Sequence, residues 1–169
     1  MSKTSPTLCG STDTDLRSRL GYIDLVRLIL AYHQAHLRRL GAALALARAV
    51  EGREAEGFPP ALADHLARML ADMAAHQARE AHLMMPRLRL GGAPWPTLGQ
   101  LQSEHASAEA DIRRLADLTG GYDAPAQACS DWRALYALCR EYEREFREHV
   151  ELEEGIVFAR FGGRPVLAA

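Results

Sequence analysis

The sequence is poor in residues that could crosslink the chain. Its 169 residues include only three cysteines, an odd number, and no two of them are spaced as Cys-x-x-Cys. If Cys129 and Cys139 share a helix, they lie about 15 Å apart, which is too far for a disulfide. We therefore expect neither a disulfide framework nor a thiolate metal site.

Long apolar runs and an excess of one charge are also missing. The longest stretch without a polar side chain, 41–47, is far too short to cross a bilayer, and the polar residues 1–15 contain no apolar run after Lys3. Lys and Arg number 20 against 22 Asp and Glu, so no basic excess attracts nucleic acid or anionic lipid. We expect a cytoplasmic protein without nucleic-acid or membrane partners.

What remains is a composition typical of one soluble domain, with 48% apolar and 25% charged residues. Apolar residues recur at helical spacing, and Gly- and Pro-containing segments at 52–60, 91–96 and 120–125 interrupt them. The pattern predicts helices at 22–51, 60–89, 97–119 and 126–160. We expect an all-α, up-down-up-down four-helix bundle over residues 16–162, with a flexible N-terminal tail at 1–15 and a C-terminal tail at 163–169.

Each predicted helix has an apolar stripe with alternating steps of four and three residues, as in left-handed bundles. In the first helix the expected stripe is Val26, Leu30, His33, Leu37, Leu40, Leu44 and Ala47. Polar residues interrupt all four stripes, and these are His33, His76, Glu80, His105, His149 and Glu153. Since an unpaired charge in a core costs several kcal/mol, these six residues need partners.

The interruptions recur at a constant interval. His33 and His105 are 72 residues apart, and the pair His76 and Glu80 reappears 73 residues later as His149 and Glu153. The chain therefore resembles a duplication, in which each half supplies one lone histidine and one His-x3-Glu pair. The two members of each pair lie on one helix face, about a turn apart.

Imidazole and carboxylate without thiolate suit Fe, Mn or Zn. Six such ligands are too many for one tetrahedral zinc, whereas two six-coordinate ions bridged by two glutamates accommodate them all. With an oxo or hydroxo bridge, about one position per metal stays open, as the binding of small diatomic molecules requires. The joint pattern thus favours a two-metal centre, although any single core histidine is more often a packing residue.

The other acidic and histidine residues serve as internal comparisons. His36, His65 and His82 fall off the expected stripes, so we assign them to solvent, to helix capping or to the support of a ligand. Glu109 follows His105 by four residues but misses the stripe, and we expect it to face solvent. The acid-rich run 141–154, apart from Glu153, is expected to be a solvated face. Tyr32 and Glu104 each adjoin a candidate ligand, where a supporting or proton-path role competes with simple packing.

Several of these residues occur in recognisable runs. They are Tyr-His-Gln-Ala-His at 32–36, His76-x3-Glu80 followed by Leu-Met-Met-Pro at 83–86, Glu104-His105, Ala-Cys-Ser-Asp-Trp-Arg-Ala-Leu-Tyr at 128–136, and His149-x3-Glu153. Together they resemble the hemerythrin-like di-iron proteins of iron–sulfur cluster repair, over roughly 22–161. The resemblance implies that the four histidines are terminal iron ligands and that Glu80 and Glu153 bridge two Fe ions.

The resemblance also implies a function in bacterial responses to nitric oxide and oxidative stress. We expect a protein that binds NO, and O2 as an alternative, and that either reduces NO or supports repair of iron–sulfur proteins with an electron donor. A non-catalytic scavenger or sensor and an iron reservoir use the same ligands and remain alternatives. Family members commonly begin with a small domain bearing adjacent cysteines, whereas here a short segment with Cys9 precedes the expected bundle.

Overall fold

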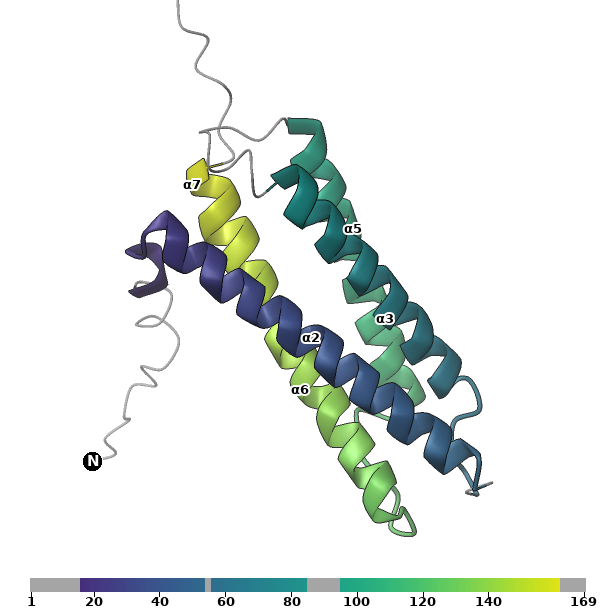
Figure 1. The fold of residues 1–169 in the computed structure, drawn as a ribbon. Coiled ribbons are helices and arrows are strands. Elements are labelled where there is room, and N and C mark those ends of the chain that lie inside the picture. The colour runs from purple at the N-terminus through teal and green to yellow at the C-terminus, as the bar shows by residue number, and fades with distance from the viewer. Residues whose placement is uncertain (1–15, 54–55, 85–94, 162–169) are drawn as a thin grey trace, which may run out of the picture.

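The computed structural model describes residues 16–53, 56–84 and 95–161. Within them the long helices are α2 (Tyr22–Glu51), α3 (Leu62–Arg79), α5 (Trp95–Leu118) and α6 (Ser130–Leu152). The short elements η1 (Glu80–Met84) and η2 (Glu153–Phe158) are π-helical, and α7 (Ala159–Phe161) ends the described chain. Consecutive long helices run antiparallel, which confirms the predicted four-helix bundle (Figure 1). The expected tails at 1–15 and 163–169 lie outside the described residues.

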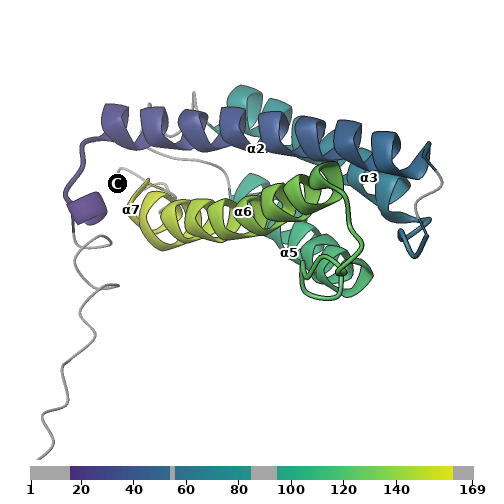
Figure 2. The same ribbon diagram turned by 90° about the horizontal axis from the view of Figure 1, so that it is seen from below.

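Helix α2 packs against both α6 and α3, and α3 packs against α5. Figure 2 shows α2 lying alongside α6. The predicted start of the last helix at residue 126 was wrong, because α6 begins at Ser130. The second helix also differs from the prediction, since α3 begins at Leu62 and becomes π-helical at Glu80.

The chain reverses between α5 and α6 through a left-handed turn. Gly120, Gly121 and Tyr122 all have positive φ, of 59°, 75° and 67°. Glycine adopts this conformation readily, whereas Tyr122 does so with strain. The backbone N–H of Tyr122 donates a hydrogen bond to the Thr119 hydroxyl oxygen at 3.2 Å, and the Tyr122 carbonyl oxygen accepts a hydrogen bond from Arg140. The predicted break at 120–125 is therefore confirmed.

The apolar core is divided into two clusters. One lies toward the α2–α3 turn and includes Leu40, Met73 and Phe146, whereas the other lies toward the opposite end and includes Ile29, Leu101 and Leu152. On α2, α5 and α6 the candidate histidines lie between residues of the two clusters, and on α3 His76 follows the last residue of the first cluster. The bundle thus places a polar layer between two apolar clusters, which exclude water from that layer.

The stripe on α2 differs from the predicted one. Its buried residues are Leu25, Ile29, His33, His36, Leu40, Ala43, Ala47 and Val50. Leu30, expected in the core, is 43% exposed, and Leu37 and Leu44 are only partly buried. Both faces of α2 are rich in Leu and Ala, so apolar content alone does not select one of them. The predicted stripe of α2 was therefore wrong at Leu30, Leu37 and Leu44, although His33, Leu40 and Ala47 are buried as expected, and the apolar stripe residues predicted between Leu62 and Met73 and between Leu135 and Phe146 are also buried.

No described helix is long and apolar enough to cross a membrane.

Candidate metal centre

Each long helix contributes one histidine to the polar layer. His33 lies in α2, His76 near the end of α3, His105 in α5 and His149 near the end of α6. The two glutamates Glu80 and Glu153 are the first residues of η1 and η2, one turn after His76 and His149. All six predicted residues are buried, with exposures between 0% and 6%. The structure therefore brings together the full predicted set.

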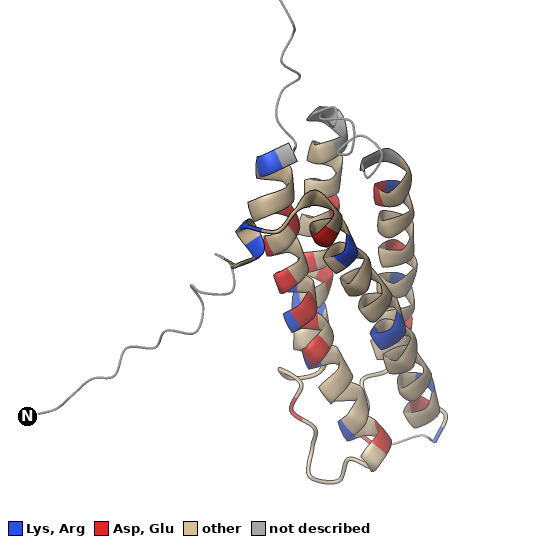
Figure 3. Ribbon diagram, turned by 60° about the vertical axis from the view of Figure 1, so that its left-hand side comes forward, with Lys and Arg blue, Asp and Glu red and all other residues tan. Residues whose placement is uncertain are grey.

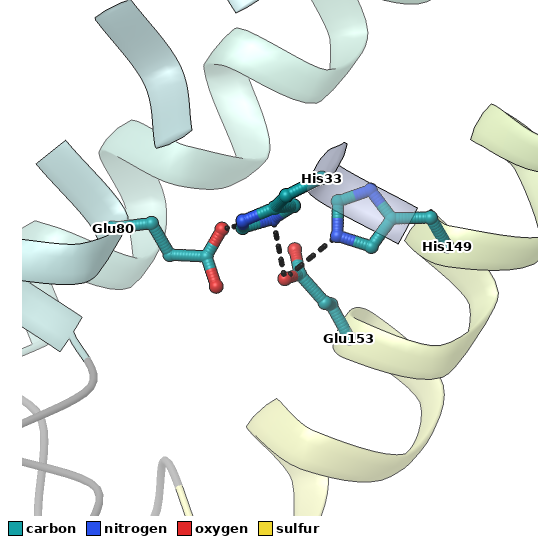
Figure 4. A group of neighbouring side chains, drawn as sticks. All are labelled: His33, Glu80, His149 and Glu153. Carbon is teal, nitrogen blue, oxygen red and sulfur yellow. Dashed lines mark ion pairs between the residues drawn. The ribbon is translucent and has the colours of Figure 1, made fainter. Parts of the chain in front are cut away.

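The side chains form two overlapping groups whose ligand atoms lie within 4.8 Å of one another. The first group is His33, Glu80, His149 and Glu153, and the second is His76, His105 and Glu153. Figure 4 shows the first group, with the imidazoles and carboxylates pointing toward one another. The two groups share the carboxylate of Glu153.

Glu153 connects the groups through its two oxygens. Its Oε1 lies 2.8 Å from His149 Nε2, and its Oε2 lies 3.2 Å from His105 Nε2. Glu80 Oε2 is 3.0 Å from His33 Nε2 and 3.8 Å from His76 Nε2. Each glutamate therefore approaches one histidine from each of the two groups, as a bridging carboxylate would.

Several of these buried atoms have no hydrogen-bond partner in the described structure. They include His33 Nε2, His149 Nε2 and both carboxylate oxygens of Glu80 and Glu153. Buried polar groups in native proteins are nearly always satisfied, and an unpaired one costs about 1–3 kcal/mol. These unpaired atoms converge on one another and consist only of imidazole nitrogens and carboxylate oxygens. Cations placed between them would satisfy all of them, so the residues fit a metal centre.

The electrostatics of the protein alone reflect this crowding. Burial, followed by the neighbouring Glu153 charge, raises the pKa of Glu80 far above its ordinary value. Burial also opposes ionisation of Glu153, but His149 and His105 outweigh it and hold its pKa well below the ordinary value. Burial, reinforced by His149, lowers the pKa of His33 to about 3. His33 and Glu153 are therefore disposed toward the protonation states that bind metal, neutral imidazole and carboxylate, whereas Glu153 and Glu154 overcome the effect of burial and raise the pKa of His105.

Two of the histidines are held by further carboxylates at their other ring nitrogen. His76 Nδ1 donates to Glu104 at 2.9 Å, and His105 Nδ1 donates to Glu154 at 2.8 Å. Glu104 is itself held by Arg79 Nε at 2.8 Å. A proton on Nδ1 leaves the Nε2 lone pair free for a metal. Glu104 therefore supports a candidate ligand, one of the two roles that the sequence left open.

The π-helical turns explain how neighbouring residues serve one site. A π-helix has an extra residue in its turn, and such turns are frequent at functional sites. In η2, Glu153 faces the shared centre while the next residue, Glu154, reaches the outer nitrogen of His105. Three consecutive residues, Ile156, Val157 and Phe158, are then all buried, which an ordinary helix face does not allow. Glu154 was wrongly included in the solvated acidic run, because periodicity assumes regular helix.

The remainder of the acidic run is engaged at the surface. Arg39 makes a two-pronged ion pair with Glu145, both distances being 2.7 Å, and Arg144 contacts Glu148 at 2.7 Å. Figure 3 shows acidic and basic positions interspersed along the helices. Glu109 lies away from the candidate ligands and contacts Arg113 and Arg147 at 3.8 and 3.7 Å. These ion pairs fit the solvent-facing role expected for Glu109 and for the acidic run.

Two of the three remaining histidines differ from a simple surface expectation. His65 is 1% exposed; its Nε2 donates to the Asp111 carbonyl oxygen at 2.8 Å, and its Nδ1 accepts from Arg68 at 2.9 Å. His36 is fully buried, and its ring centroid lies 5.1 Å from that of His149. Only His82 is exposed. His36 was missed because it belongs to the true stripe of α2, one position from the predicted Leu37.

His36 is expected to make the metal-free protein sensitive to acid. Burial, reinforced by His149, lowers its pKa from 6.5 to about 3. Between these values the unfolded chain binds a proton that the folded chain does not, so stability is present above pH 6.5 and is lost as the pH falls toward 3. One such group contributes up to about 1.4 kcal/mol per pH unit.

Substitution His36→Phe should remove this contribution, and urea unfolding at several pH values measures it. His82→Phe, at an exposed histidine, is the matched control and should leave the slope unchanged. An unchanged slope in His36→Phe would contradict the assignment.

A cavity of about 290 Å³ adjoins the site on the side of α3 and α5. His76 and His105 line it, together with Met69, Met73, Tyr142 and Phe146. Its apolar wall suits small uncharged molecules. Of the four candidate histidines, only those of the second group reach it.

Tyr32 lies on the opposite side of the site. Its ring is stacked on His149 with centroids 5.8 Å apart, and its hydroxyl donates to Glu148 at 3.1 Å. It therefore packs against a candidate ligand while its polar end is anchored at the surface.

Comparison with known proteins bears on this geometry. Residues 24–161 match the family described as "Hemerythrin HHE cation binding domain". The chain is 34% identical over 132 residues to the iron-sulfur cluster repair protein DnrN of Neisseria gonorrhoeae, a match that covers 76% of this chain and 83% of the relative.

Two further relatives are the iron-sulfur cluster repair proteins YtfE of Pectobacterium atrosepticum and of Musicola paradisiaca, which are 27% and 29% identical over 142 and 138 residues. These matches cover 81% and 79% of this chain but only 64% and 62% of the relatives. The chain thus spans less than two thirds of the length of these two proteins.

Proposed function

The chain belongs to the hemerythrin HHE cation-binding family, and from that premise we propose that it is a non-haem di-iron protein that binds nitric oxide and acts in iron–sulfur cluster repair. One observation carries the proposal: six buried polar groups converge, and the ligand atoms of four of them, His33, His149, Glu80 and Glu153, have no hydrogen-bond partner among the described residues. The names of the relatives support the repair role. The cytoplasmic location expected from the sequence is part of the same proposal.

In this proposal His33 and His149 would hold one iron, His76 and His105 would hold the other, and Glu80 and Glu153 would contribute carboxylate oxygens to both. Two ferrous ions would supply the two electrons, and solvent the two protons, that reduction of two nitric oxide molecules to nitrous oxide and water requires. The chain contributes neutral imidazoles, fixed at His76 and His105 by Glu104 and Glu154. Its two apolar clusters exclude water around the centre.

The cavity beside His76 and His105 supports a small uncharged ligand rather than a large substrate. Its surface is mostly apolar, although Asp72, Arg79, Glu104 and Asp111 also line it, and the buried candidate ligands His76 and His105 are part of its lining. Nitric oxide and O2 are small, uncharged and poorly hydrated, so both are compatible with such a space. O2 is therefore the alternative ligand.

The experiment begins with iron analysis of the purified protein, where about two irons per chain are expected. The anaerobic diferrous protein is then mixed with nitric oxide, and the headspace is analysed for nitrous oxide. About one nitrous oxide per di-iron protein is expected in a single turnover. Stable nitric oxide binding without product would instead indicate a scavenger or sensor. Rapid iron transfer to a chelator or to a cluster-free iron–sulfur protein would indicate an iron donor, and absence of bound iron would contradict all three.

A further inference from the structure

The two groups of candidate ligands differ in what lies next to the Nδ1 atoms of their histidines. His76 and His105 each donate from Nδ1 to a carboxylate, at 2.9 and 2.8 Å. The carboxylates nearest to His33 and His149 face their Nε2 atoms instead. Behind His149 lie the rings of Tyr32 and His36, at 5.8 and 5.1 Å between centroids, and its Nδ1 has no hydrogen-bond partner among the described residues.

This difference has a chemical consequence for bound metal. A carboxylate that accepts the Nδ1 proton of an imidazole makes its Nε2 a stronger electron donor. Strong donors stabilise the higher oxidation state of iron. An imidazole surrounded by aromatic rings lacks this support.

The sets of ligand atoms are unequal as well. Four residues converge around His33 and His149, whereas three converge around His76 and His105. The cavity reaches only the second group. The Nδ1 carboxylates and the cavity thus distinguish the second group, whereas the larger number of ligands distinguishes the first, although the repeated sequence makes the two groups look alike.

From these contacts we propose that Glu104 and Glu154 are positioning residues that would make the two iron sites inequivalent, by strengthening His76 and His105 as electron donors. This inference rests on the proposed di-iron function and concerns how its two sites divide their roles.

The test uses the full chain loaded with ⁵⁷Fe and measured by Mössbauer spectroscopy. In the diferric protein we expect two quadrupole doublets with different parameters. Glu154→Gln keeps the shape of the side chain and removes its charge, so the parameters of the two doublets should become more similar. Iron release to a chelator should also be biphasic, and the substitution should accelerate loss of one of the two irons about tenfold or more.

Glu148→Gln is the matched control. The side chains of Glu148 and Glu154 are both 34% exposed, but Glu148 contacts Tyr32 and Arg144 rather than a candidate ligand. The Glu148→Gln substitution removes the same charge from the same stretch of helix and should leave the parameters of both doublets unchanged. Equal shifts in the two variants would show a general charge effect and would overturn the proposal.

Glu104→Gln provides a second variant if Glu154→Gln binds too little iron. Loss of iron from both variants would show that these carboxylates retain the metal rather than distinguish the sites, and would also overturn the proposal. Two bound irons with identical doublets in the unsubstituted protein would refute the inequivalence but leave the di-iron function standing. A protein without iron would instead refute the function itself.

Discussion

Substitution of Glu153 by glutamine is expected to abolish most iron binding, from about two irons per chain to fewer than one. Glu153 belongs to both groups of candidate ligands, with one carboxylate oxygen 2.8 Å from His149 and the other 3.2 Å from His105. Glutamine keeps the shape but replaces one oxygen with an amide nitrogen, which does not bind metal. Iron analysis after purification, normalised to protein, measures the loss.

Glu80→Gln should have a smaller effect, because Glu80 belongs to the first group only and lies 3.8 Å from His76. Glu109→Gln is the control, since Glu109 also follows a histidine by four residues but contacts arginines instead. It should retain the unsubstituted iron content. Equal iron contents in Glu153→Gln and Glu109→Gln would contradict the bridging assignment.

Removal of iron is expected to lower the melting temperature by about 5–11 °C. Metal bound at a hundred times its dissociation constant stabilises the folded state by about 2.7 kcal/mol, and each kcal/mol shifts the midpoint by about 2–4 °C at this chain length. Without metal, Glu80 and Glu153 are two fully buried carboxyl groups facing each other. Scanning calorimetry of iron-loaded and metal-free protein measures the difference.

The sign of the Glu80→Gln effect should depend on the metal. In the metal-free protein the substitution removes a buried ionisable group from beside Glu153, so the melting temperature should rise. In the iron-loaded protein it removes a ligand, so the melting temperature should fall. A reduction of similar size in both forms would indicate an ordinary structural role for Glu80 and would count against the metal centre.

The six candidate ligands could be proposed from the sequence because their pattern depends on repetition and polarity. Six polar residues interrupt apolar stripes, and four of them recur at an interval of 73 residues as two His-x3-Glu pairs. This reasoning does not require knowledge of which helix faces which. It correctly placed His76 on α3 and His149 on α6 in the core, because large apolar residues share their faces, although it left out the buried His65.

The same reasoning failed where two helix faces were equally apolar or where the helix was irregular. On α2 it placed Leu37 in the core instead of His36, since Leu and Ala occur on both faces. At the end of α6 it treated Glu154 as a surface residue, since no periodicity reveals a π-helical turn. Both residues lie beside candidate ligands that they contact only in the folded bundle.

The sequence by itself thus determined the helical class, the duplicated pattern and the six polar residues that the core must accommodate. Only the tertiary structure decided which histidines share a group and that Glu153 faces both groups. It also decided that carboxylates stand behind His76 and His105. The physical reason is that spacing along one helix determines which face a residue occupies, whereas distances between helices depend on how the four faces pack together.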